Sequence, residues 1–418
     1  MTKRPDGLSA YIAVTAAYWA FMLTDGALRM LVLLYFHTRG FSPVQLAYLF
    51  VLYEVAGMVT NLSAGWIAAR FGLTSTLYAG LGLQVLALIA LAQLDPGWAV
   101  GLSVAFVMVV QGASGVAKDL AKMSSKSAVK ILAPTEAGGL FRWVAVLTGS
   151  KNAVKGLGFL LGAALLATVG FVWAVLAMAA VLAGILVFVL FAMPPGRKGV
   201  KFSEVFSKSA NVNWLSAARV FLFGARDVWF VVGLPVYFYA VLSDGTEQGS
   251  RAAFFMIGTF MALWIILYGA VQASAPRLLR AASRSEAQLI GAARGWARAL
   301  AVIPAVLSVA ALLSPAPQTW LTVTRIAGLL VFGAIFAVNS ALHSYLILAF
   351  TRAERVTMDV GFYYMANAGG RLLGTVLSGF TYQAGGLALM LGTAALMVAV
   401  SALAAGRLRL NPDKGATA

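Results

Sequence analysis

Apolar residues run along this chain in long segments that short polar turns separate. Twelve of these segments are long enough to cross a bilayer, since about 20 apolar residues in a helix match its hydrocarbon core. The expected spans are residues 10–36, 44–69, 73–93, 98–122, 138–168, 170–193, 214–241, 252–276, 288–313, 320–350, 358–382 and 385–406. Turn sequences such as Asp95-Pro96-Gly97 lie between neighbouring spans. The pattern predicts an all-α integral membrane protein with twelve transmembrane helices.

The composition agrees with this prediction and excludes several functions. Hydrophobic residues make up 61% of the chain and charged residues 11%, whereas soluble domains carry about 25% charged residues. The absence of cysteine and the presence of only two histidines, His37 and His343, exclude thiolate chemistry and a histidine-rich metal cage. No serine–histidine pair, paired aspartates or phosphate-binding loop favours an intramembrane enzyme or an ATP-driven pump. We therefore expect no catalytic residue, metal or cofactor.

The net charge of +17 arises mostly in short loops, where basic residues set the orientation of a membrane protein. We interpret it as a topology signal and expect no nucleic-acid partner. One predicted side holds Lys3, Arg4, Arg70, Lys122, Lys126, Lys130, Arg197, Lys198, Lys201, Lys208, Arg277, Arg280, Arg284, Arg352, Arg355, Arg407 and Arg409. The other side has little beyond Arg39 and Arg251. The positive-inside rule then places both termini in the cytoplasm.

The polar stretch Pro194–Asn213 lies near the midpoint and reads as an amphipathic linker at the cytoplasmic interface. It predicts an N-terminal six-helix bundle at 1–193, a linker at 194–213 and a C-terminal six-helix bundle at 214–418. The two halves echo each other. Asp25 with Tyr35-Phe36 matches Asp227 with Tyr237-Phe238, Lys155-x-x-Gly158 matches Arg371-x-x-Gly374, and Trp98 matches Trp320. These matches support a six-plus-six duplication.

Two lysines stand near the middle of the apolar segment Leu140–Val169. Lys151 and Lys155 are four residues apart, so they share one helical face, and Asn152 lies between them in sequence. A lysine at mid-membrane depth costs at least ~2.5–3.5 kcal/mol. A structural ion pair is one explanation of the two lysines. We favour a polar cavity that binds an anion, in which Gly156, Gly158 and Gly162 serve close helix packing rather than phosphate binding.

Arginines enter the membrane from the first and seventh spans. Arg29 and Arg226 come from symmetry-related helices, and the planar guanidinium binds phosphate-like oxyanions in a bidentate manner. Asp25 and Arg29 are spaced i, i+4 and can pair with each other. Arg226 and Asp227 are adjacent, so we expect them to face different directions and to satisfy each other less well.

Cations outnumber carboxylates among the charged residues expected at mid-membrane. The predicted substrate-binding residues are Arg29, Lys118, Lys151, Asn152, Lys155, Arg226 and Arg371, and the residues predicted for proton coupling or ion pairing are Asp25, Glu54 and Asp227. Glu54 has no obvious partner in the sequence, and a partly desolvated carboxyl has a raised pKa and can carry a proton. A packing contact with a nearby base is an equally good explanation of Glu54.

Three further features have simpler interpretations. The stripe Lys118, Asp119, Lys122, Lys126 and Lys130 reads mostly as a solvated cytoplasmic helix end, with Lys118 the deepest member. We place Arg325 near the outer end of its span. We interpret His343 and Asn339 as a satisfied polar contact rather than as ligands.

Two motifs resemble signatures of the major facilitator superfamily. Residues Gly65–Gly72 are similar to the signature between spans two and three, but Ala69 replaces the usual aspartate. Val110-Gln111-Gly112 resembles part of the fourth-span signature, although the usual upstream arginine is Met108. The resemblance implies two parallel six-helix repeats with the substrate site between them at mid-membrane. The departure at Ala69 puts the usual cytoplasmic charge pair in doubt.

Four longer stretches resemble the organoarsenical efflux permeases (ArsJ family) of bacterial arsenic-resistance operons. They are Leu23–Leu34, Ala117–Lys130, Leu140–Gly156 and Phe221–Pro235. The resemblance implies an inner-membrane exporter of 1-arseno-3-phosphoglycerate that confers arsenate resistance. We expect this exporter to be a monomer and to be proton-coupled. Glyceraldehyde-3-phosphate dehydrogenase would be the functional partner that produces this substrate. An organic-phosphate antiporter without an arsenic role is the alternative, and a drug/proton antiporter fits less well because cationic drugs favour an acidic cavity.

Overall fold

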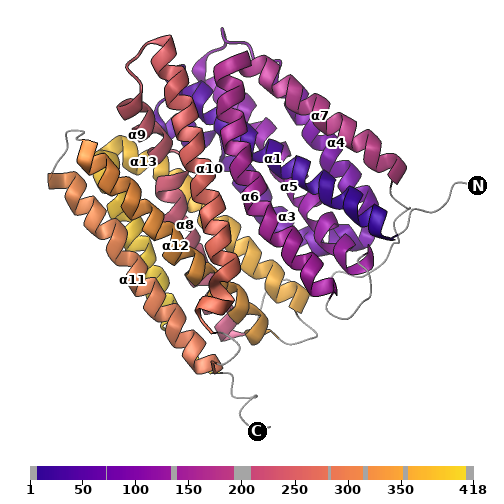
Figure 1. The fold of residues 1–418 in the computed structure, drawn as a ribbon, viewed down its shortest axis with the longest axis vertical. Helices are drawn as coiled ribbons and strands as arrows, with labels where there is room; N and C mark the ends of the chain where they lie inside the picture. Colours follow the sequence, from indigo (N-terminus) through magenta and orange to yellow (C-terminus); the bar gives the residue numbers. More distant parts are fainter. Residues whose placement is uncertain are drawn as a thin grey trace, which may run out of the picture. The chain divides into compact units, whose positions relative to one another are not determined.

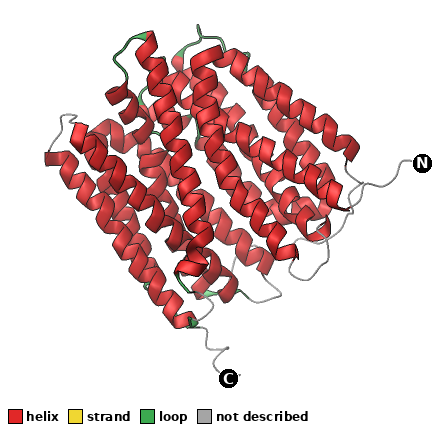
Figure 2. Cartoon of the chain, viewed as in Figure 1, coloured by secondary structure: helices red, strands yellow, loops and turns green. Residues whose placement is uncertain are grey.

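The computed structural model describes residues 7–71, 73–132, 139–192, 209–280, 284–313, 319–351 and 356–410, and these residues form helices joined by short loops (Figure 2). The helices, labelled in Figure 1, are α1 (Gly7–Thr38), α2 (Pro43–Tyr48), α3 (Val51–Phe71), α4 (Leu73–Leu91), α5 (Val100–Leu132), α6 (Gly139–Val169), α7 (Phe171–Ala192), α8 (Ala210–Phe230), α9 (Gly233–Leu242), α10 (Glu247–Leu278), α11 (Glu286–Leu313), α12 (Thr319–Phe350) and α13 (Val356–Ala405).

Eleven stretches of the described residues are long and apolar enough to cross a membrane. The longest, Asp359–Ala405, has 47 residues, and at 1.5 Å per residue it is about twice as long as one crossing needs. The chain kinks within it at Gly385 and Gly386, and Gly386 has φ +57°, a conformation that glycine adopts without strain. The kink divides α13 into two crossings. The protein is therefore an all-α, multi-pass membrane protein, as the hydrophobic pattern predicted.

Two of the predicted spans contain a break that the pattern did not predict. Residues 44–69 form α2 and then α3, and residues 214–241 form α8 and then α9. Pro235 explains the second break, because proline has no N–H to donate to the carbonyl of Val231. Ser378 of α13 compensates there: its hydroxyl oxygen accepts hydrogen bonds from the backbone N–H groups of Val232 (3.3 Å) and Gly233 (3.1 Å).

Contacts divide the chain into two compact units. The first unit comprises Met1–Phe41, Tyr48–Phe202 and Phe238–Ile266, and the second comprises Ser42–Ala47, Ser203–Tyr237 and Leu267–Ala418. The division at 194–213 remains a prediction from the sequence. In the first unit α1 packs along α6 and also contacts α5 and α7, while α3 and α4 pack on α5. In the second unit α13 packs along α8 and α11, and α12 packs on α11 and α8.

Glycines bring α1 and α6 into backbone contact. A Cβ added at Gly158 would meet the backbone of Leu23 and Ala27, and one at Gly162 would meet Ala27. The packing role predicted for these two glycines is confirmed. In the second unit a Cβ at Gly374 would meet Gly224 and Asp227 of α8 in the same way.

Substitution of Gly162 by alanine is expected to destabilise the protein by about 1–3 kcal/mol, because the added methyl group forces α6 away from α1. The measurement is the melting temperature of the purified protein in detergent. Gly184 of α7 provides the matched control, since a Cβ there has no neighbour within 4 Å among the described residues. Equal melting temperatures for the two alanine variants would contradict the packing role of Gly162.

Candidate functional site

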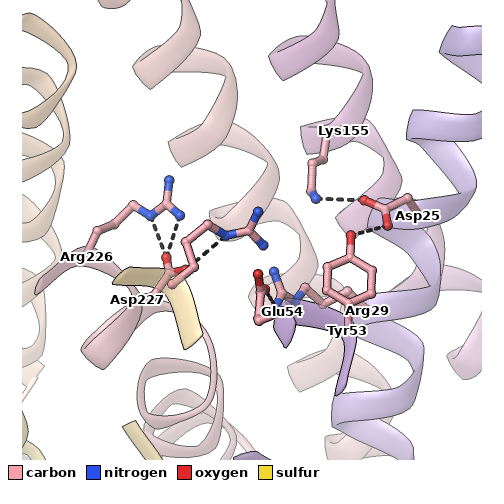
Figure 3. Close-up of polar contacts among 8 residues, drawn as sticks. Asp25, Arg29, Tyr53, Glu54, Lys155, Arg226 and Asp227 are labelled. Carbon is pink, nitrogen blue, oxygen red and sulfur yellow. Dashed lines mark hydrogen bonds and ion pairs between the residues drawn. The ribbon is translucent and has the colours of Figure 1, made fainter. Parts of the chain in front are cut away.

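The first unit holds a charged cluster centred on Asp25 of α1. Lys155 of α6 donates to the Asp25 carboxylate at 2.7 Å, and the Tyr53 hydroxyl of α3 donates to its other oxygen at 2.5 Å (Figure 3). The ammonium nitrogen of Lys118 lies 4.1 Å from the centroid of the Tyr53 ring. Exposed fractions of 15% for the Lys155 side chain and 3% for that of Asp25 show that the ion pair is largely shielded from solvent. Three helices thus converge on one carboxylate.

A second ion pair joins α1 to α3 in the same unit. Arg29 donates to Glu54 at 2.8 Å, and Glu54 is fully buried (Figure 3). The rings of Phe50 and Tyr53 lie 5.1 and 5.3 Å from the guanidinium carbon of Arg29. The sequence allowed two interpretations of Glu54, and its contact with a nearby base is confirmed. Its role in proton coupling remains a prediction.

Asp25 and Arg29, whose spacing would allow them to pair, do not pair with each other. Although the two residues share a face of α1, Asp25 binds Lys155 of α6 and Arg29 binds Glu54 of α3. The reason is packing, because the neighbouring helices bring an ammonium group and a carboxylate closer than the next turn of α1 does. Both charges of α1 are therefore neutralised from other helices, which ties α1 to α3 and α6.

The second unit holds a related cluster centred on Asp227 of α8. Arg226 contacts one carboxylate oxygen through Nε at 2.6 Å and through Nη2 at 2.5 Å, and Arg371 of α13 lies 3.4 Å from the other oxygen. The expectation that Arg226 and Asp227 would satisfy each other poorly is wrong, because the long arginine side chain folds back onto its neighbour (Figure 3). Two cations share one carboxylate here.

The two clusters repeat one arrangement. Asp25 pairs with Lys155, and the matching residue Asp227 pairs with Arg371. In each unit a glycine three residues after the cation, Gly158 or Gly374, packs on the helix that carries the aspartate. The internal sequence repeat is thus reproduced in side-chain contacts.

The stripe at the end of α5 is less solvated than expected. Lys118 and Asp119 are buried, so the expectation of a solvated helix end is wrong for these two residues. Asp119 accepts hydrogen bonds from Thr60 at 2.8 Å and from Lys122 at 3.1 Å, and Lys122 also donates to Asn61 at 2.8 Å. The side chains of Lys126 and Lys130 lie outside the described residues.

Two predicted site residues lie one turn before Lys155 on α6. Lys151 and Asn152 are both half-buried. The helical spacing of four residues places Lys151 on the same face as Lys155. Their part in substrate binding remains a prediction.

Sequence reasoning missed Arg219 of α8, which is only 4% exposed. It donates to Asn367 at 2.9 Å and to the backbone and hydroxyl oxygens of Ser340 at 3.1 Å each. No carboxylate among the described residues pairs with it. The sequence did contain a signal for Arg219, since it lies inside the predicted span 214–241. A cation within a span needs an explanation, and this holds for Arg219 as it does for Arg226.

Two polar residues of α12 also differ from expectation. His343 is fully buried, and neither ring nitrogen has a hydrogen-bond partner among the described residues. Asn339 donates to the carbonyl of Ala293 at 3.5 Å, and its own carbonyl oxygen has no such partner within the described part of the chain. The expected satisfied contact is therefore wrong. Arg325, also of α12, is buried and donates to the Tyr237 hydroxyl at 2.6 Å.

Cations exceed carboxylates in both clusters. The first unit places Arg29, Lys118, Lys122 and Lys155 against Asp25, Glu54 and Asp119, and the second places Arg226 and Arg371 against Asp227. An excess of cations in a desolvated setting favours the binding of an anion. Within the described residues, no group of three or more histidines, aspartates or glutamates is placed to hold a metal ion.

The fold matches those of several solved transporter structures. A POT family transporter in complex with 5-aminolevulinic acid aligns with a TM-score of 0.71 at 14% identity, over 96% of this chain and 95% of that one. A point mutant of the nucleoside transporter NupG gives 0.69 at 14% identity, over 96% and 98%. The inward-open xylose transporter XylE from E. coli gives 0.67 at 12%, over 97% and 95%.

At the level of sequence, no protein-family model and no curated protein matches the chain. The structural likeness, at these low identities, shows the fold.

Proposed function

We propose that the protein is a secondary active transporter that exports an anionic phosphorylated solute, 1-arseno-3-phosphoglycerate, from the bacterial cytoplasm through the inner membrane, in which both termini face the cytoplasm. The observation that carries the proposal is the excess of cations over carboxylates in the two clusters on membrane-spanning helices. The similarity of the fold to transporters supports the transport mode. Export of this ester, which glyceraldehyde-3-phosphate dehydrogenase forms from arsenate, would confer arsenate resistance.

The chemistry of the clusters suits such a substrate. The ester carries oxyanion groups at both ends, and cations outnumber carboxylates in each cluster. Arg29, Arg226 and Arg371 offer the planar fork that binds phosphate and arsenate oxygens in pairs. Lys155 and Lys118 add compact positive charges. An arriving anion would compete with the resident carboxylates for these cations.

Two other kinds of transporter have a different substrate. An organic-phosphate antiporter would use the same excess of cations, so it is the alternative function. A cationic drug would be repelled by the same clusters, which disfavours a drug/proton antiporter. The arsenic role itself is supported by the sequence resemblance.

The decisive experiment measures arsenic uptake into everted membrane vesicles that contain the protein. The vesicles receive arsenate, glyceraldehyde 3-phosphate, NAD and glyceraldehyde-3-phosphate dehydrogenase, and the control lacks the dehydrogenase. We expect uptake only when the dehydrogenase is present. Uptake with arsenate alone would indicate an inorganic oxyanion exporter. No uptake in either case, by correctly inserted protein, would favour the organic-phosphate antiporter.

A further inference from the structure

Arg219 of α8 is a buried cation whose described contacts are all with neutral groups. Its Nε donates to Asn367 and its Nη1 to Ser340, while the Phe223 ring lies 3.9 Å from its guanidinium carbon. A guanidinium group has five N–H donors, and Nη2 has no acceptor among the described residues. A buried charge without a counter-charge is costly. The arrangement therefore leaves both a charge and donors for a ligand.

Arg219 and Arg226 both lie over one aromatic ring, that of Phe223. They are seven residues apart on α8, which is nearly two full turns, so they share a face of the helix. The Phe223 ring centroid lies 3.9 Å from the guanidinium carbon of Arg219 and 4.9 Å from that of Arg226. The two guanidinium carbons cannot be farther apart than the sum of these distances. Two oxyanion-binding forks thus lie within a short distance of each other.

A further buried polar residue lies one turn from a partner of Arg219. His343 follows Ser340 by one turn on α12, and Ser340 accepts hydrogen bonds from Arg219. His343 is fully buried, and both ring nitrogens are without a hydrogen-bond partner among the described residues. A neutral imidazole has one N–H donor in either tautomer. His343 and Arg219 thus both have N–H donors without an acceptor among the described residues, as expected for a site that binds an anion.

We propose that Arg219, assisted by His343, is a specificity-determining anion subsite that binds the second oxyanion group of a substrate whose first oxyanion group is bound at Arg226. This inference rests on the proposed function, because it assumes an anionic substrate. The ligand class is a short carbon chain with an oxyanion group at each end, such as a phosphorylated carboxylic acid. The subsite selects two-ended anions over single-ended ones, since a single-ended ligand leaves the donors of Arg219 without an acceptor.

The test compares two probes that differ at one end. 3-Phosphoglycerate carries a phosphate and a carboxylate, whereas glycerol 3-phosphate has a hydroxymethyl group in place of the carboxylate. Binding is measured by the rise in melting temperature of the purified full-length protein as each probe is titrated. The wild-type protein is expected to bind 3-phosphoglycerate more tightly, by roughly tenfold to a hundredfold, which is the range for hydrogen bonds to a charged group.

Variants separate the subsite from general electrostatics. Arg219→Gln is expected to remove the preference for 3-phosphoglycerate and to leave glycerol 3-phosphate binding unchanged, whereas Arg226→Gln weakens the binding of both probes. Arg219→Lys keeps the positive charge but loses the planar fork, and it is the variant to use if Arg219→Gln does not fold. It is expected to retain only part of the preference for 3-phosphoglycerate. Arg294→Gln is the matched control, because Arg294 binds the backbone carbonyls of Ala405 and Leu408, and it should change neither affinity.

The subsite is overturned if Arg219→Gln weakens the binding of both probes equally, or if both Arg219 variants keep the wild-type preference for 3-phosphoglycerate. Either result would show that Arg219 does not bind the second oxyanion group. If the wild-type protein binds neither probe, the anion-transport proposal fails and the subsite fails with it. Binding of both probes without any preference in the wild-type protein would overturn the subsite alone.

Discussion

Substitution of Asp25 by asparagine is expected to lower the free energy of unfolding by about 3–5 kcal/mol and to abolish transport. Asp25 is the carboxylate that Lys155 and Tyr53 both contact, and its removal leaves a largely buried ammonium group without its partner. Lys155→Met should have an effect of similar size, because it leaves the Asp25 carboxylate without its ammonium group. Thermal unfolding in detergent and vesicle uptake measure the two effects separately.

The double variant of these residues separates folding from substrate binding. Asp25→Asn combined with Lys155→Met buries no unpaired charge from this pair, so its melting temperature should return close to that of the wild-type protein. Transport should stay abolished, since Lys155 is proposed to bind the anion. A stable and inactive double variant is therefore the expected result.

Asp119 and Lys122 provide a matched control in the same unit. Their ion pair is shielded from solvent to the same degree as that of Asp25 and Lys155, with side-chain exposures of 1% and 17%. Neither residue is a proposed substrate-binding residue, although Lys118, which is one, precedes Asp119 in the sequence. The double variant Asp119→Asn with Lys122→Met should keep transporting. Wild-type uptake by the Asp25 and Lys155 double variant would instead make that pair a structural ion pair and remove Lys155 from the binding site.

The fold could be predicted from the sequence because the length of an apolar segment is a local property. A helix in a bilayer satisfies its own backbone, so each run of about 20 apolar residues reports one crossing without reference to its neighbours. The break at Val231 has a local cause in Pro235, but the backbone N–H groups of Val232 and Gly233 are satisfied by the hydroxyl of Ser378, which lies on a distant helix. Such compensation by a distant helix leaves no mark in the local pattern.

The charged residues could be found from the sequence, but their partners could not. The cost of a charge within an apolar run singled out Asp25, Arg29 and Glu54, whereas the choice of partner depends on which helices pack together. Close approach of α6 to α1 at Gly158 is what brings Lys155 to Asp25. The internal repeat carried more information, since the match of Lys155 with Arg371 corresponds to equivalent ion pairs in the structure.

Arg219 shows a different kind of failure. It lies inside the predicted span 214–241, where a cation needs an explanation, but the sequence does not show which groups would contact it. Its contacts with Ser340 and Asn367 come from α12 and α13, which follow more than a hundred residues later. Depth in the bundle, rather than distance from the end of an apolar run, decides whether such a cation is solvated.

Glu54→Gln is expected to abolish accumulation driven by a pH gradient and to preserve exchange of substrate between equal concentrations. Glu54 is fully buried and bonded to Arg29, so an anion that binds Arg29 displaces the carboxylate from its cation. A carboxylate that has lost its cation can take up a proton, so the protonation of Glu54 becomes linked to substrate binding at Arg29. Glutamine has the same shape and its oxygen still accepts a hydrogen bond from Arg29, but it cannot titrate.

Vesicles measure both properties in one preparation. Accumulation is followed after an imposed pH gradient, and exchange is followed with labelled substrate at equal pH on the two sides. Asp119→Asn is the matched control, because Asp119 is also a buried carboxylate of the first unit, and its hydrogen bonds are with Thr60, Asn61 and Lys122. It should lower the rate without changing the response to the gradient. An unchanged gradient response in Glu54→Gln would leave Glu54 as an ion-pair partner that holds α3 to α1.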